Sequence, residues 1–166
     1  SSRIVSVSDS EESGSWSAQS HAQETCSVRT VHDSMVVNDD GAKRWPSLRN
    51  FYRIVPGGMR DGALAFSDSS DVWREVPAEL IGADQVRTFA VDGFNWWMKL
   101  TLELRRPSRV FVLVDLRNPA PEWVRREFTD TGKTLKLDFK LTPAGGKVAR
   151  LLPYGIWERR VEAAGP

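Results

Sequence analysis

Every second position of residues 94–104 holds an apolar side chain. Successive side chains of a β-strand point to opposite faces of the sheet, so this spacing predicts a long strand with one buried face. The apolar face comprises Phe94, Trp96, Met98, Leu100, Leu102 and Leu104. The other face carries Asn95, Trp97, Lys99, Thr101 and Glu103. The alternation therefore predicts that Trp97 lies on a polar, solvent-facing side of the strand.

Trp97 is the sharpest candidate for a ligand-binding residue. An exposed indole offers a flat apolar plate against which a sugar ring or a protein partner can rest. Asn95, Lys99 and Thr101 share its face, and their side chains can hydrogen-bond to hydroxyl groups. Trp73 follows a loop and is a second candidate, either as an aromatic at the edge of a site or as part of a satellite core. The competing interpretation of Trp97 is burial under a second layer, which would leave no site there.

The bulk composition is that of one ordinary globular domain. The 166 residues are 40% hydrophobic and 27% charged, which is enough apolar material for a core. The net charge of +1 gives no electrostatic case for a nucleic-acid partner or an acidic membrane surface. No apolar run reaches the roughly 18 residues that would span a bilayer. Cys26 is the only cysteine, so no disulfide forms within the chain.

Composition divides the chain into three regions. Serine crowds residues 1–30, and such polar sequence buries too little apolar surface to offset the entropy of ordering. We therefore expect a flexible N-terminal segment that the fold does not need, with at most a short strand at 3–7. Residues 31–49 are expected to be an irregular lead-in with room for a short strand at 35–37. The packed module is predicted to span 50–162.

Residues 50–162 predict an all-β fold. Short runs of apolar or alternating residues, separated by Gly and Pro turns, predict strands at 51–55, 63–66, 85–90, 94–104, 110–114, 135–141 and 154–161. The run at 110–114 is apolar on both faces, so it should be a central strand. A turn is expected at 129–132, and short helical turns at 77–81 and 121–127. With no long helix, this pattern favours a single antiparallel β-sandwich of the jelly-roll type.

No catalytic or metal-binding motif stands out. One cysteine and two histidines cannot form a Cys/His metal cluster, and the acidic turns at 38–41 and 68–71 lack the spacing of a calcium loop. A glycan-active hydrolase or lyase is the alternative function, with Asp115 paired to Glu122 or Asp130. Carboxylates without a catalytic role are the simpler interpretation. The sequence therefore favours a non-enzymatic binding module without a cofactor, and a structural spacer domain is a further alternative.

Five segments, taken in order and spacing, resemble an accessory β-sandwich module found in bacterial FecR-type regulators and in secreted or surface multidomain proteins. These segments are 54–60, 76–89, 110–115, 121–132 and 154–159. The resemblance covers about two thirds of the chain, residues 54–161.

The resemblance implies a non-catalytic domain related in architecture to carbohydrate-binding modules. It also implies a location outside the cytoplasm, whether periplasmic, on the cell surface or secreted. The expected partners are a glycan or a cell-surface protein, and the oligomeric state stays open. Because the chain starts at Ser1 without methionine, we expect a processed chain or a piece of a longer surface or regulatory protein.

Overall fold

The structure, a computed structural model, describes residues 2–9, 27–33, 53–88, 100–141 and 148–162. The regular elements of this part are mostly strands, and the predicted all-β class with antiparallel pairing is confirmed. The strands are β1 Ser2–Asp9, β2 Val28–Asp33, β3 Arg53–Val55, β4 Val72–Arg74, β5 Asp84–Arg87, β6 Leu100–Leu104, β7 Ser108–Asp115, β8 Thr129–Leu141 and β9 Val148–Val161. The two predicted helical turns are also confirmed, as the 3₁₀ helix η2 (Ala78–Leu80) and the α-helix α4 (Glu122–Glu127).

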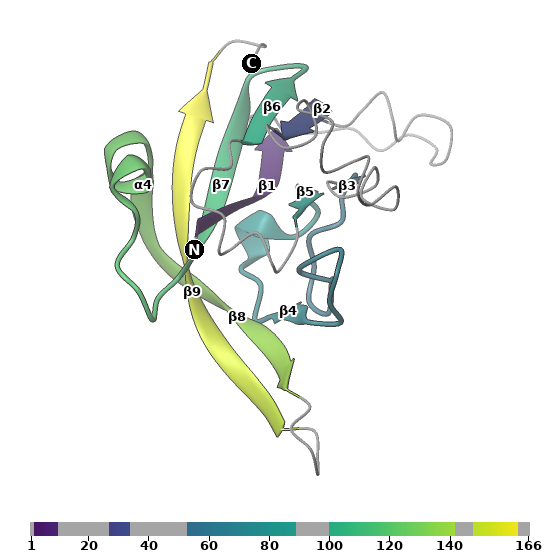
Figure 1. Cartoon of the computed structure of the whole chain (residues 1–166). Coiled ribbons are helices and arrows are strands. Elements are labelled where there is room, and N and C mark those ends of the chain that lie inside the picture. Colours follow the sequence, from purple (N-terminus) through teal and green to yellow (C-terminus); the bar gives the residue numbers. More distant parts are fainter. Residues whose placement is uncertain (1, 10–26, 34–52, 89–99, 142–147, 163–166) are drawn as a thin grey trace.

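Seven strands form one sheet in the order β3-β5-β1-β7-β9-β8-β4, and β2 pairs with β6 in a separate two-stranded sheet. All the strand pairs are antiparallel. The long β8–β9 hairpin extends past the rest of the sheet (Figure 1). The finer prediction of a jelly-roll sandwich stays a prediction, because most of the strands belong to one continuous curled sheet.

The seven-stranded sheet curls until its β4 end meets β5 again. Leu64 bridges Val72 of β4, and two residues later Phe66 bridges Thr88, just after β5. The Ser67 backbone N–H donates to the Thr88 carbonyl at 2.8 Å. Backbone hydrogen bonds thus link the two sides of the sheet through residues 63–67, and the inner face becomes enclosed.

The inner face of the curled sheet holds the main hydrophobic core. Alternate residues of β7, β8 and β9 point inward, and η2 adds Leu80. The buried members of this core are Met59, Ala65, Phe66, Trp73, Leu80, Ala83, Phe111, Leu113, Leu135, Leu137, Leu152, Tyr154 and Ile156. The predicted alternation of 135–141 is confirmed where side chains are described, since Leu135 and Leu137 are buried while Lys136 and Asp138 are only half-buried.

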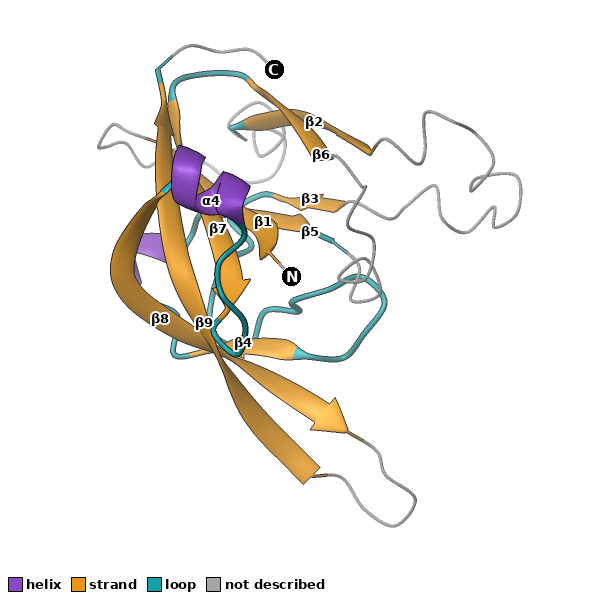
Figure 2. Ribbon diagram, turned by 60° about the vertical axis from the view of Figure 1, so that its left-hand side comes forward, coloured by secondary structure: helices purple, strands orange, loops and turns teal. Residues whose placement is uncertain are grey.

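The outer face of the sheet is covered in two places. The β2–β6 pair packs over it through Val28 and Leu104, which contact Val86 and Val110. Helix α4 covers the neighbouring part of β7 through Val124 (Figure 2). Strand β7 is therefore covered on both faces, which confirms the central strand predicted from its continuous apolar run.

The N-terminal residues differ from the prediction. Strand β1 (Ser2–Asp9) lies between β5 and β7 inside the sheet, so the short strand expected at 3–7 is present and longer. These residues belong to the sheet and not to a separate flexible segment, and whether the fold needs them stays a prediction. The prediction failed because neighbouring strands supply the backbone hydrogen bonds on both sides of β1, which a composition argument does not see. Strand β2 likewise precedes the expected module boundary. Residues 10–26 and the expected strand at 35–37 lie outside the described residues.

Candidate functional site

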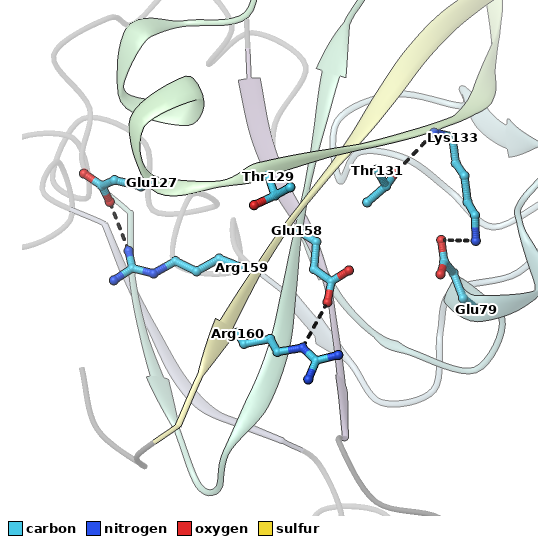
Figure 3. Close-up of a pocket in the computed structure, with 8 residues that line it drawn as sticks. All are labelled: Glu79, Glu127, Thr129, Thr131, Lys133, Glu158, Arg159 and Arg160. Carbon is cyan, nitrogen blue, oxygen red and sulfur yellow. Dashed lines mark hydrogen bonds and ion pairs between the residues drawn. The ribbon is translucent and has the colours of Figure 1, made fainter.

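A groove of about 630 Å³ opens between η2, the end of α4 and the β8–β9 ladder (Figure 3). Its lining is almost entirely charged or hydroxyl-bearing: Glu79, Glu127, Thr129, Thr131, Lys133, Glu158, Arg159 and Arg160. The volume falls within the roughly 300–1,000 Å³ that is common for small-molecule sites. The groove is therefore the candidate site among the described residues.

Strand alternation places the charged residues of the groove. The inward positions of β7 include Phe111, and the next inward position toward the start of that strand is Arg109. In the β7–β9 register, Phe111 lies opposite Glu158, and Arg109 lies opposite Arg160. Partners in register share a face of the sheet, so the inner face changes from apolar to charged at this end. The core ends here and the groove begins.

A bulge in β8 shapes the other wall of the groove. The register against β9 shifts between Asp130 and Thr134, and Gly132 adopts a φ of 71°, in the left-handed region that glycine tolerates. Asp130 Oδ1 accepts a hydrogen bond from Gly132 N at 2.9 Å, and Thr131 Oγ1 donates one to the Ile156 carbonyl at 2.7 Å. The predicted turn at 129–132 is therefore wrong. Asp130 and Gly132 make a local bend, and β8 continues through it.

The inner charges form a connected ion-pair network. Arg109 donates two hydrogen bonds to Glu158, Nε to Oε1 at 2.7 Å and Nη2 to Oε2 at 2.9 Å. Arg109 also lies 3.7 Å from Glu79, and Arg160 lies 3.7 Å from Glu158. Lys133 Nζ lies 3.1 Å from Glu79 Oε1, but that buried oxygen receives no well-directed hydrogen bond within the described part of the chain. The Lys133 contact is thus a charge–charge contact.

The Arg109 pair fixes the charge state of its carboxylate. Hydrogen bonding from Arg109 lowers the pKa of Glu158 below its ordinary value, although partial burial acts in the opposite direction. The same contact raises the pKa of Arg109. Arg109 is also held over the Phe111 ring, 5.0 Å from its centroid. Glu158 therefore stays ionised near neutral pH and is poorly suited to act as a general acid, which requires a raised pKa.

The outer side of the groove carries a second set of ion pairs. Glu127, at the end of α4, accepts a hydrogen bond from Arg159 at 3.0 Å and another from Arg126 at 3.0 Å. Arg159 follows Glu158 on β9 and so points to the opposite face of the strand. Charged groups therefore border the groove on both sides of β9.

The sequence-predicted binding face is described only in part. Trp97, Asn95 and Lys99 lie outside the described residues, so the predicted site is neither brought together nor excluded. Thr101 is described, and it is exposed on β6 (Leu100–Leu104). Within that strand Leu104 is buried and Thr101 is not, as the alternation predicts. Thr101 is not among the residues that line the groove.

Trp73 is not a surface aromatic, and its assignment to a ligand site is corrected here. Its side chain is 0% exposed and lies in the middle of the main core. Its ring makes an edge contact with Tyr154 at 5.2 Å and a tilted contact with Phe66 at 6.2 Å. The loop before Trp73 suggested an edge position, but β4 directs this residue inward beneath the closing segment 63–67.

The carboxylate pair considered for hydrolysis does not assemble. Asp115 lies opposite Tyr154 in the ladder, whereas Asp130 lies opposite Trp157. Positions 154 and 157 have opposite parity on β9, so the two carboxylates face opposite sides of the sheet. Asp115 is also buried, and hydrogen bonds from Arg117 lower its pKa despite that burial. Glu122 is exposed on α4.

Sequence reasoning missed the groove residues on the inner face. Arg109, Lys133 and Glu158 belong to no motif that the sequence analysis singles out. A signal was present, because Glu158 and Arg160 continue the inward alternation of Tyr154 and Ile156 with charged side chains. Recognising it required knowing which parity of β9 faces inward.

No cluster of three or more metal-binding side chains is found in the described ranges. No helix in this part of the chain is long and apolar enough to cross a bilayer. Comparisons with protein-family models, with curated proteins and with solved structures gave no match to this chain.

Proposed function

We propose that this chain is a non-catalytic binding module for a glycan, and that the groove beside β8 and β9 forms part of its binding surface. The observation that carries the proposal is the lining of that groove. Carboxylates, guanidinium groups, an ammonium and hydroxyls alternate along one open surface. Sugar hydroxyls both donate and accept hydrogen bonds, so they suit a surface that offers both kinds of group.

The charge states of two carboxylates support a non-catalytic role. A glycosidase needs one carboxylic acid with a raised pKa beside a second carboxylate. The pKa values of Glu158 and Asp115 are both displaced downward by arginine partners. These two carboxylates therefore lack the protonation state that acid catalysis requires. A hydrolase or lyase remains the alternative function, and a structural spacer the third.

The setting of the module is proposed from the resemblance alone. A FecR-type or surface multidomain parent places it outside the cytoplasm, as a jelly-roll domain related in architecture to carbohydrate-binding modules. In that setting the face with Trp97, Asn95, Lys99 and Thr101 would provide a second contact surface, with the indole stacking on a sugar ring.

A glycan array probed with the purified chain tests the proposal, and the same glycans are assayed for turnover. Binding without turnover is the expected result. Lys133→Ala should weaken binding because Lys133 lines the groove. Lys136→Ala, on the same strand but outside the groove, is the matched control. Turnover abolished by neutralising one carboxylate would instead establish the enzyme, and no binding to any glycan or protein would favour the spacer.

A separate substitution tests the second contact surface. Trp97→Ala should weaken glycan binding without lowering the melting temperature if that face is exposed. A Trp97→Ala chain that fails to fold would mean that the face is packed against another layer, and this part of the proposal would be withdrawn.

A further inference from the structure

We propose that the groove selects glycans that carry carboxylate or sulfate groups, an inference that rests on the proposed glycan-binding function. The charges around the groove are unequal in number. The groove is lined by three carboxylates and three cations, and two further arginines that do not line it pair with the same carboxylates. The ion-pair network around the groove therefore holds five cations to three carboxylates, although the whole chain is nearly neutral. The carboxylates are Glu79, Glu127 and Glu158, and the cations are Arg109, Arg126, Lys133, Arg159 and Arg160.

The sheet also brings two like charges together beside the groove. Arg109 and Arg160 are direct partners in the β7–β9 register. Side chains at such positions start about 4.5–5.5 Å apart at their Cβ atoms, and like charges placed there repel. One carboxylate, Glu158, serves both arginines. It bonds Arg109 through both oxygens at 2.7 and 2.9 Å, and Arg160 lies farther away, at 3.7 Å.

The cations around the groove differ in how accessible they are to a ligand. Arg109 is fixed, with a side chain only 26% exposed between Glu158 and the Phe111 ring. The side chain of Arg160 is 74% exposed and that of Lys133 is 54% exposed. Both line the groove. Arg109 thus takes both oxygens of Glu158, and the exposed cations Arg160 and Lys133 are accessible to an incoming anion.

The chemistry of those cations favours oxyanions on a polar scaffold. A guanidinium presents several N–H donors in a planar fork that fits a carboxylate or a sulfate through two parallel hydrogen bonds. An ammonium at Lys133 adds a second positive contact across the groove. A uronic acid or a sulfated sugar would supply the missing negative charge to Arg160 and place its hydroxyls against Glu79 and Thr131, which line the same groove.

Binding of the full chain to charged and neutral polysaccharides tests the inference. Polygalacturonate and chondroitin sulfate are the acidic probes, and dextran and hydroxyethyl cellulose are the neutral ones. The wild type should prefer the acidic polymers, and its affinity should fall as NaCl is raised. Arg160→Gln should lower affinity for the acidic polymers about tenfold, because one charge-assisted contact is lost.

Arg150→Gln is the matched control, since Arg150 is also an exposed arginine of β9 but does not line the groove. It should leave affinity unchanged, which separates a groove contact from a general effect of net charge. Far-UV circular dichroism and melting temperature should match the wild type for both variants, because both side chains are exposed.

The outcomes separate this inference from the proposed function. Equal binding of neutral and acidic polymers, unaffected by Arg160→Gln, would overturn the charge selection and leave glycan binding standing. Equal loss in Arg150→Gln and Arg160→Gln would also overturn it, because the effect would not belong to the groove. Failure to bind any of the four polymers or any array glycan would overturn the proposed function, and the inference would fall with it.

Discussion

Replacing Trp73 with alanine should be among the most damaging single substitutions in this chain. The side chain is fully buried at the centre of the main core. Truncating a buried aromatic to alanine costs about 3–5 kcal/mol of unfolding free energy, and the edge contact with Tyr154 at 5.2 Å belongs to a class worth about 0.5–1.5 kcal/mol beyond area. One term acts in the opposite direction. The buried Trp73 Nε1 has no hydrogen-bond partner among the described residues, and removing it relieves a cost of about 1–3 kcal/mol.

The net expectation for Trp73→Ala is therefore a loss of about 3 kcal/mol, near the lower end of the aromatic range. For a domain of this size each kcal/mol lowers the melting temperature by about 2–4 °C, so we expect a drop of roughly 6–12 °C. Trp73→Phe should cost much less, because it keeps a ring in the core and also removes the unpaired N–H. Urea unfolding followed by far-UV circular dichroism measures the free energy, and a thermal scan measures the shift.

Trp123→Ala is the control for this prediction. Trp123 lies on α4, is 38% exposed, and makes one edge contact with Phe128 at 5.9 Å. Its loss should cost only about 1 kcal/mol. If Trp73→Ala melted within about 2 °C of the wild type, far less than the smallest expected drop of about 6 °C, Trp73 would not be a core residue, and its reassignment from the ligand site would be refuted.

Three further predictions concern charge, backbone strain and the N-terminus. Arg109 lowers the pKa of Glu158 in the folded state. The stability that this ion pair contributes is therefore fully present above the unfolded pKa of about 4.3 and is lost as the pH falls through the folded pKa. In urea unfolding, Glu158→Gln should be less stable than the wild type at pH 7, and the difference in unfolding free energy should disappear in acid. Glu75 has a φ of 54°, a backbone conformation that glycine adopts without strain. Glu75→Gly should relieve about 1 kcal/mol of strain and lose an exposed ion pair to Lys136 that is worth about 0–1 kcal/mol. Its unfolding free energy in urea should therefore equal or slightly exceed that of the wild type. Deleting residues 1–9 removes β1 from between β5 and β7, so the cooperative thermal transition should be lost; a truncated chain that melts like the wild type would show that β1 is not part of the stable sheet.

Local signals predicted many elements of the fold correctly. The continuous apolar run of β7, the alternation of β8 and the proline-initiated turns at η2 and α4 depend on neighbours a few residues apart. Such signals survive in a single sequence because strand parity and helix starts are set by the local chain. The positions of these elements, apart from the start of β8 at Thr129, were therefore predictable without knowing what packs against them.

Long-range pairing could not be predicted in the same way. Strand β1 gains its place from hydrogen bonds to β5 and β7, more than 70 residues away in the sequence, as in the pairs Val7 with Asp84 and Val7 with Val110. The closure of the sheet depends on single bridges from Leu64 to Val72 and from Phe66 to Thr88. A strand is predicted at 63–66, but alternation does not identify the residues with which it pairs. The burial of Trp73 could not be predicted for the same reason, because β4 is buried by residues 63–67, which close the sheet.

The groove follows from the same alternation that builds the core. The inward side chains of a curled sheet are apolar where opposite sides of the sheet pack together, because an unpaired charge is too costly in the interior. Charged side chains can take inward positions only where the enclosed volume opens to water. On β9 that change falls between Ile156 and Glu158, and on β7 between Phe111 and Arg109. Because the two strands are antiparallel and paired in register, both changes occur at one end of the sheet. Charged residues of distant sequence position therefore gather at a single opening, and that opening is where we expect a ligand to bind.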